Sequence, residues 1–252
     1  MQCGRVLNPP IEGMIGDHTG NNISEKNRDY CELTAHYFVW KNIRADYYGF
    51  CHYRRFFCFD ERIKKTYLAL GRLSQRQKER LLGNAEKNRE LILGQDIVIP
   101  YAERMEVSVR DYYITAKNQY AADLELFLEI VKEKYPNILP FAEQYLAQEK
   151  HYFCNMFIMR KEFFSEYCEI LFSVLEEFDF RKTHSGDRTD GYLGEIFTGI
   201  YITYAKSKNA KIKEITRIDV NCTLKKRLGC FLFPPESRRR LILKKAIRRV
   251  RT

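Results

Sequence analysis

The stretch DYYGFCHYRR, residues 46–55, joins a short aromatic run to a strongly basic loop. An aromatic or β-branched run of about 4–8 residues between polar residues is typical of a buried strand. Two further runs have the same character, DIVIP at 96–100 and YFCNMFIM at 152–159. Helix-like segments separate the three runs, so the sequence predicts an α/β fold. We expect a sheet flanked by helices, with ligands at the carboxyl ends of its strands.

Apolar spacing outward from these runs predicts several helices, at about 24–43, 74–93, 161–178 and 190–206, with further helical segments between 108 and 149. A last short strand is expected near 211–218. No repeat or low-complexity linker interrupts this part of the chain, so residues 1–222 are interpreted as one domain.

The composition is that of a globular protein, with 252 residues of which 45% are hydrophobic. The longest uncharged run, residues 196–205, is too short to cross a bilayer. The first residues do not form the basic-then-apolar pattern of a secretory signal, so a cytoplasmic location is expected. The eight cysteines include no C-x-x-C pair, which indicates small buried thiols rather than a metal site or a redox motif.

The net charge of +10 is confined to the C-terminal tail, residues 223–252. This tail holds 11 of the 43 Lys and Arg residues and 1 of the 33 acidic residues, so the preceding residues are neutral. Residues 237–252 have the spacing of a basic amphipathic helix, with Leu243, Ala246, Ile247 and Val250 on one side. Docking on an anionic membrane surface is favoured. An RNA-binding arm is less favoured, because the arginines lack interleaved aromatic residues, and a solvated end is the third alternative.

A first polar cluster, GDHTGNNIS at 16–24, leads into the first predicted helix. Free N–H groups at a helix start favour an anion, which makes Asp17, Asn22 and Ser24 candidate ligand-binding residues. The same residues are good turn formers and helix caps. On these residues alone, the turn-and-cap explanation is favoured.

A second cluster, HYRR at 52–55, follows the first strand directly. The guanidinium groups of Arg54 and Arg55, with His52, are well matched to the oxygens of a diphosphate. The alternative is ion pairing with nearby acids such as Asp60 and Glu61. The spacing also matches the H-x-x-R of tyrosine recombinases, but that motif belongs late in a helical catalytic domain.

A third cluster, RTDGYLGE at 188–195, runs from a loop into a helix. A carboxylate near arginines and a helix start can deprotonate or orient a hydroxyl beside a bound phosphate, which makes Asp190 and Glu195 candidate catalytic residues. Acids at this position also stabilise a helix dipole without any catalytic role.

The combined motifs resemble, in order, a family of glycosyltransferase-like proteins from bacterial capsular-polysaccharide and lipopolysaccharide gene clusters, long classed as a domain of unknown function. The matching segments are GDxTGxNISxKN (16–27), YCELT (30–34), WKN (40–42), YGFCHYRRF (48–56), NMFIM (155–159) and RxxGYxxE (188–195). The resemblance covers about residues 4–220. It implies a GT-A-like, Rossmann-like fold. It also implies transfer of a hexose from a UDP-sugar to a lipid-linked or other saccharide acceptor. Together with the basic tail, this predicts an enzyme bound peripherally to the inner face of the plasma membrane.

The resemblance also implies roles for the clustered residues. GT-A enzymes usually carry a metal-binding Asp-x-Asp at the strand end, where this sequence has His52-Tyr53-Arg54. We therefore expect no cofactor and no metal site, Mn²⁺ or Mg²⁺ being possible but not favoured. The implied sites are the donor diphosphate (His52, Arg54, Arg55, Arg188), the nucleotide (Asp17, Asn22, Ser24), the sugar or acceptor (Asn155, Met156) and catalysis (Asp190, Glu195).

The sequence departs from the family at its start. Family members begin with an apolar strand that carries a His-Lys pair, and this sequence starts inside or just after that strand. The expected consequence is a sheet edge without its first strand. The alternatives to an active transferase are therefore a truncated, non-catalytic paralogue and a basic-tailed nucleic-acid adaptor.

Overall fold

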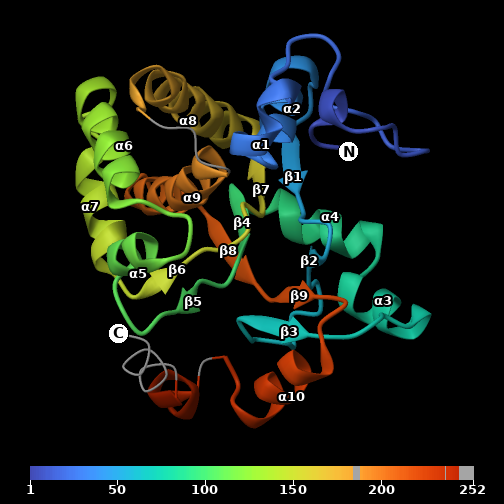
Figure 1. Cartoon of the computed structure of the whole chain (residues 1–252). Coiled ribbons are helices and arrows are strands. Elements are labelled where there is room, and N and C mark those ends of the chain that lie inside the picture. The colour runs from blue at the N-terminus through green and yellow to red at the C-terminus, as the bar shows by residue number, and fades with distance from the viewer. Residues whose placement is uncertain (184–187, 236, 244–252) are drawn as a thin grey trace. The chain divides into compact units, whose positions relative to one another are not determined.

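The computed structural model describes residues 1–183, 188–235 and 237–243 and has a mixed α/β architecture (Figure 1). The chain forms two compact units, each assembled from separate stretches of sequence. The first unit comprises Met1–Tyr48, Arg110–Ala147 and Met159–Lys208, and the second comprises Gly49–Val109, Gln148–Ile158 and the described residues from Asn209 on. Residues on both sides of residue 222, the expected domain boundary, belong to the second unit.

The first unit is mainly helical. Its elements are η1 (Arg5–Leu7), η2 (Ser24–Lys26), α1 (Asn27–Tyr30), α2 (Leu33–Asn42), α6 (Ala121–Lys134), α7 (Leu139–Ala147), α8 (Lys161–Arg181) and α9 (Thr189–Ser207), with α5 (Val109–Thr115) starting at its boundary. Helices α2 and α6 pack on α8, and α1 and α7 pack on α9. Helices α7 and α9 approach closely at Gly199 of α9, where a Cβ atom would lie 1.8 Å from the ring of Tyr145 on α7. Only glycine fits at this crossing.

The strands of the described residues form three small sheets. Strands β1 (Tyr47–Phe50), β7 (Phe157–Arg160), β4 (Ile97–Pro100) and β8 (Ile212–Ile215) make a sheet in the order β1-β7-β4-β8, in which β4 and β8 are parallel. In the second sheet, β9 (Arg217–Asp219) runs antiparallel to β2 (Arg55–Phe57) and parallel to β3 (Tyr67–Ala69). The third pairs β5 (Glu103–Arg104) with β6 (Lys150–His151). All four residues of β4 are buried, as expected of an apolar run in a parallel pair.

The described part of the second unit contains apolar clusters and the helices α3 (Gln75–Leu82), α4 (Ala85–Leu93) and α10 (Leu224–Leu232), besides the helical residues 238–243. Leu91 and Ile92 of α4 pack against the sheet residues Val98 and Ile215, so this helix covers the sheet. Each helix starts at a side-chain cap, supplied by Ser74, Asn84 and Thr223 respectively.

Three predicted elements are interrupted where the backbone turns. The helix expected over 24–43 breaks at Cys31, which has a φ of 51°. The helix expected over 74–93 breaks at Gly83, where φ is 68°, and restarts at the Asn84 cap. The strand expected over 152–159 begins only at Phe157, because Cys154 and Asn155 adopt φ angles of 85° and 46°. Such angles take the chain out of regular structure.

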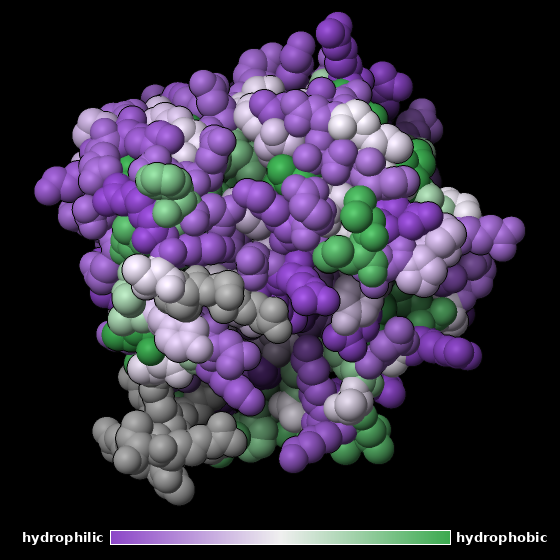
Figure 2. Space-filling view, turned by 45° about the horizontal axis from the view of Figure 1, so that its top comes forward, coloured by the Kyte–Doolittle hydropathy of each residue, from purple (hydrophilic) through white to green (hydrophobic). Residues whose placement is uncertain are grey.

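The face of the molecule seen in Figure 2 is largely hydrophilic, with scattered hydrophobic residues. Among the helices of the described residues, none has both the length and the apolar composition that a membrane span requires. The predicted C-terminal helix is described only in part. Residues 238–243 are helical, while Ala246, Ile247 and Val250 lie outside the described residues.

Candidate functional site

The predicted site residues are divided between the two units. The first unit contains Asp17, Asn22, Ser24, Arg188, Asp190 and Glu195, and the second contains His52, Arg54, Arg55, Asn155 and Met156.

A basic pocket lies in the second unit, with a volume of about 240 Å³. Arg54 and Arg55 line it from the start of β2, and Asp219 lines it from the end of β9. Thr223 and Lys226 line it from the start of α10, where the Thr223 hydroxyl accepts the backbone N–H of Lys226 at 3.3 Å. The pocket therefore combines arginine side chains with a helix N-terminus, two features that favour an anion.

Positive charge exceeds negative charge in the basic pocket. The buried Asp219 carboxylate accepts from Lys226 Nζ at 2.9 Å and lies 3.9 Å from Arg55 Nε. It also accepts from Arg217 at 2.7 Å, but Arg217 has a second partner in Glu103 at 2.6 Å. Burial opposes ionisation of Asp219, yet the neighbouring cations, Arg217 first, lower its pKa below the ordinary value. One carboxylate thus faces three pocket cations.

Arg54 is the pocket cation best placed to meet a ligand. It is exposed and, among the described residues, makes no ion pair. Its guanidinium lies over the ring of Tyr53, 4.7 Å from the centroid, and its carbonyl accepts the N–H of Val220 at 2.9 Å. The loop is also closed by the Arg55 N–H, which donates to the carbonyl of His52 at 2.9 Å.

The acids considered as alternative partners of the two arginines pair elsewhere. Asp60 accepts from Arg62 at 2.7 Å, and Glu61 accepts from Lys213 at 2.6 Å. Asp219, which the sequence reasoning missed, is the acidic neighbour of Arg55. Its side chain comes from β9, far along the chain, and no local pattern indicates the pairing.

Asn155 and Met156 differ in their surroundings. The Met156 side chain is buried in the apolar cluster with Phe57, Val98 and Ile215. Asn155 is also buried and follows Cys154 in a turn where both residues have positive φ. Consecutive non-glycine residues in this region are strained, and such strain is often found at functional sites.

Asp17 is the centre of a buried hydrogen-bond network in the first unit. Its Oδ2 accepts from the Gly4 N–H at 2.8 Å and from the Thr34 hydroxyl at 2.6 Å. Its Oδ1 accepts from the Arg5 N–H at 3.0 Å and from the Ser24 hydroxyl at 2.6 Å. Burial opposes ionisation, but these bonds lower the pKa of the carboxyl. The carboxylate thus joins three chain segments.

The Asn22 side chain holds the same loop through hydrogen bonds to its backbone. Its side-chain oxygen accepts the Ser24 N–H at 3.2 Å, and its Nδ2 donates to the Gly20 carbonyl at 3.0 Å. The structure therefore gives Asp17, Asn22 and Ser24 clear roles in holding the loop. Their contact with a nucleotide stays a prediction.

Asp190 lies in the first turn of α9, fully buried. One oxygen accepts from Lys182 Nζ at 3.1 Å, and Lys182 also contacts Asp179 at 2.6 Å. Burial, followed by repulsion from Asp179, raises the pKa of Asp190 to about 7. A carboxyl with such a pKa can exchange a proton near neutral pH.

Three buried polar atoms near the start of α9 have no hydrogen-bond partner among the described residues: Asp190 Oδ1, Thr189 Oγ1 and Tyr113 Oη. The charge of Asp190 contributes to the raised pKa of Tyr113, after burial and Asp123, which indicates that the tyrosine and Asp190 are neighbours. Sequence reasoning missed Tyr113, Lys182 and Asp179, because nothing in their local sequence connects them with Asp190. Unsatisfied buried groups of this kind are candidates for binding water or a ligand hydroxyl.

Arg188 and Glu195 flank Asp190 on the chain. Arg188 has a φ of 73° at the start of α9, its N–H donates to the Arg28 carbonyl at 3.0 Å, and its guanidinium lies 5.6 Å from the Tyr192 ring centroid. Glu195 is five residues after Asp190, which turns it by roughly 140° around the helix. The two acids therefore point in different directions rather than forming a pair.

No group of His, Cys, Asp and Glu side chains within the described residues could hold a metal ion. In the basic pocket the single carboxylate is already paired with cations, so its donor set does not suit Mn²⁺ or Mg²⁺. Metal-independent donor binding stays a prediction.

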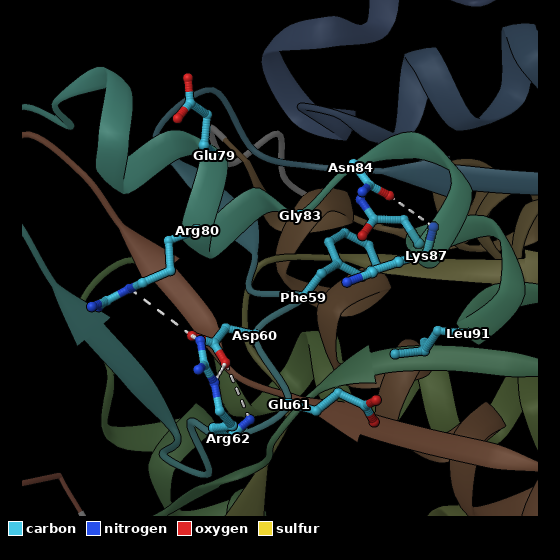
Figure 3. Close-up of a pocket in the computed structure, with 11 residues that line it drawn as sticks. Phe59, Asp60, Glu61, Arg62, Glu79, Arg80, Gly83, Asn84, Lys87 and Leu91 are labelled. Atoms are coloured by element: carbon cyan, nitrogen blue, oxygen red, sulfur yellow. Dashed lines mark hydrogen bonds and ion pairs between the residues drawn. The ribbon is translucent and has the colours of Figure 1, made fainter.

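A larger pocket in the second unit, of about 640 Å³, lies between α3, α4 and the segment after β2 (Figure 3). Asp60 faces Arg62 and Arg80, while Phe59 and Lys87 lie together in another part of the pocket. The charged residues that line it balance: Asp60, Glu61 and Glu79 against Arg62, Arg80 and Lys87. A neutral pocket with an aromatic ring and many hydrogen-bonding groups suits a ligand rich in hydroxyls.

The sequence matches a family described as a "Domain of unknown function (DUF4422)" over residues 1–208. Among solved structures, the apo structure of WbbM, a bifunctional glycosyltransferase, has a TM-score of 0.80 and 31% sequence identity. The similar region covers 86% of this chain but 41% of WbbM, so the chain spans less than half of that protein. No curated protein matches the sequence. The similarity confirms the predicted fold, a glycosyltransferase-like α/β domain with a sheet flanked by helices.

Proposed function

The chain belongs to the DUF4422 family, and on this premise we propose that it is a glycosyltransferase that takes a hexose from a UDP-sugar. The similarity to WbbM supports sugar transfer in general. The observation that carries the donor assignment is the basic pocket, where Arg54, Arg55 and Lys226 face a single carboxylate.

The basic pocket would hold the diphosphate of the donor. During transfer the bond between the anomeric carbon and the diphosphate oxygen breaks, and the nucleoside diphosphate leaves with increased negative charge. Arginine and lysine donors that are already fixed in place stabilise this charge without a metal ion. Arg54 and Arg55 would make the main contacts, with His52 holding the turn. Arg188, in the other unit, remains a predicted donor ligand.

Asp190 is the proposed catalytic base. The acceptor hydroxyl must lose a proton as it attacks the anomeric carbon, and a carboxyl with a pKa near 7 can accept that proton at neutral pH. The unsatisfied Oδ1 of Asp190 and the hydroxyl of Tyr113 support a polar ligand at this position. Glu195 is the second candidate, as a residue that binds the acceptor. Asn155 remains a predicted sugar ligand, while the burial of Met156 favours an indirect role.

The acceptor is proposed to be a lipid-linked glycan of capsule, exopolysaccharide or lipopolysaccharide synthesis. The neutral pocket around Phe59 and Asn84 is suited to its sugar residues. Residues 237–252 would hold the protein at the cytoplasmic face of the membrane, where such an acceptor lies. A role in nucleic-acid binding is not favoured.

A thermal-shift titration tests the donor assignment, because a ligand that binds the folded state raises its melting temperature. UDP, UDP-glucose, UDP-galactose and GDP are compared, with Mn²⁺ and with chelator. We expect a shift with the UDP compounds that persists in chelator and is lost in Arg54→Ala. Arg72→Ala, an exposed arginine outside the basic pocket, is the matched control and should retain the shift.

The other outcomes point to different functions. A shift that requires Mn²⁺ or Mg²⁺ would contradict the metal-free arrangement. UDP binding without transfer to any saccharide acceptor would favour the non-catalytic paralogue. No shift with any nucleotide, together with salt-sensitive RNA binding that is lost on deletion of residues 237–252, would favour the adaptor.

A further inference from the structure

Helix α10 is oriented with its polar side toward the protein and its apolar side toward solvent. Its inner side rests on Tyr67 of β3: Lys226 Nζ lies 5.4 Å from the Tyr67 ring centroid, and Cys230 Sγ donates to the Tyr67 hydroxyl at 3.6 Å. Lys226 also bonds Asp219 at 2.9 Å. Lys226 and Cys230 therefore attach the helix and leave its apolar residues facing solvent, which is the reverse of a normal surface helix.

The outer side of α10 carries large apolar side chains. Leu224, Leu228 and Phe231 are spaced four and three residues apart and so lie on one face of the helix. Phe231 is 81% exposed, and Leu224 and Leu228 are 65% and 51% exposed. Leu232, 62% exposed, widens this apolar face.

The segment after α10 is anchored to the same tyrosine and adds to the exposed apolar residues. Arg240 donates to the Tyr67 hydroxyl at 2.7 Å and to the Phe233 carbonyl at 3.1 Å. These bonds attach the helical residues 238–243 to the C-terminal end of α10 and to β3. Ile242 and Leu243 are exposed at 68% and 42%.

Basic side chains border the apolar face, and α10 itself contains no acidic residue. Lys225 and Arg227 are exposed, and helical spacing places them on opposite sides of the apolar face. Arg238 and Arg239 are exposed on the following segment. Residues 220–235 contain no Asp or Glu. An apolar stripe between cations complements an anionic lipid surface, in which the headgroups meet the cations and the acyl boundary takes up the apolar side chains.

We propose that the apolar face of α10, with Leu224, Leu228, Phe231 and Leu232, inserts into the interfacial region of an anionic lipid bilayer. The apolar face of α10 precedes the segment 237–252 that is predicted from sequence to dock, and its proposed role goes beyond sugar transfer. Tyr67 fixes its orientation through Lys226, Cys230 and Arg240.

Co-sedimentation of the full chain with vesicles tests the proposal. Vesicles of phosphatidylglycerol mixed with phosphatidylethanolamine are compared with vesicles of phosphatidylcholine alone. The chain should bind the anionic vesicles, and Phe231→Ser should weaken that binding about tenfold, since burial of one large aromatic side chain is lost. Leu228→Ser should act in the same direction.

The matched control is Phe180→Ser, which removes another highly exposed phenylalanine, 86% exposed, from α8 in the first unit. Its vesicle binding should equal that of the wild type. Both α10 variants should keep the wild-type melting temperature and UDP response, so a failure of donor binding and a failure of membrane docking are distinguishable. Equal binding by Phe231→Ser and wild type would overturn the proposal. So would Phe231→Ser splitting a dimer in the absence of vesicles, because a second copy would then cover α10.

Discussion

Replacement of Asp17 by asparagine tests whether this residue holds the loop or binds the ligand. The two carboxylate oxygens accept four hydrogen bonds, each oxygen taking one backbone N–H and one hydroxyl. Asparagine keeps the shape but offers one oxygen and one NH₂ group. Whichever way it is oriented, the N–H of Gly4 or Arg5 then faces another donor.

The loss of stability in Asp17→Asn depends on which hydrogen-bond donors can also act as acceptors. The hydroxyl of Ser24 or Thr34 can rotate and accept from the new NH₂ group, but a backbone N–H cannot. One buried N–H without an acceptor costs about 1–3 kcal/mol, and loss of the charge weakens the remaining bonds by about 1 kcal/mol. We therefore expect Asp17→Asn to lower the free energy of unfolding by about 2–4 kcal/mol. The melting temperature should fall by about 5–15 °C.

Urea unfolding at several pH values, with the exposed Asp46→Asn as control, measures this effect. The pKa of Asp17 is lowered in the folded state, so its contribution to stability is present above the ordinary value of 3.8 and is lost as the pH falls through the folded value. The difference in free energy of unfolding between wild type and Asp17→Asn should therefore become smaller in acid. The reasoning is refuted if Asp17→Asn melts like the wild type yet no longer binds UDP, because the carboxylate would then contact the nucleotide.

Four further substitutions have expected outcomes. Burial raises the pKa of Asp190 to about 7, so the wild type loses stability as the pH rises from 3.8 toward 7. Asp190→Asn lacks this loss. Its free energy of unfolding, measured in urea and compared with that of the wild type, should therefore increase by about 1.4 kcal/mol per pH unit in that window. Gly199→Ala should destabilise by about 3 kcal/mol or more through its clash with Tyr145, whereas Gly229→Ala, with open space around it, should be neutral or stabilising by about 0.5–1 kcal/mol; thermal melts compare them. Glu195→Ala should reduce transfer in a coupled UDP-release assay, and unchanged turnover would remove Glu195 from the site.

Local sequence patterns predicted the fold well where burial is continuous. The apolar run at 97–100 is a buried strand, and the long periodic segments at 161–181 and 189–207 are helices. Predictions failed where one residue changes the backbone direction. At Cys31 the backbone leaves the helix with a φ of 51°, although the helical spacing of apolar residues continues past it. The spacing alone therefore does not reveal the break.

For a similar reason, the sequence indicates only some of the residues that line the basic pocket. The basic loop at 52–55 is visible because its arginines follow a strand directly. The residues that set its charge, Asp219 and Lys226, come from β9 and α10 and become neighbours only in the folded chain. The same is true of Lys182, which contacts both Asp179 and Asp190. Long-range pairings of this kind leave no local pattern.

The structure of the chain with UDP bound tests the central claim most directly. We predict that the diphosphate lies in the basic pocket, within hydrogen-bond distance of Arg54 and Arg55, with no metal ion between them and the phosphates. Well-defined UDP with its phosphates elsewhere, or held by a metal ion, would contradict the account.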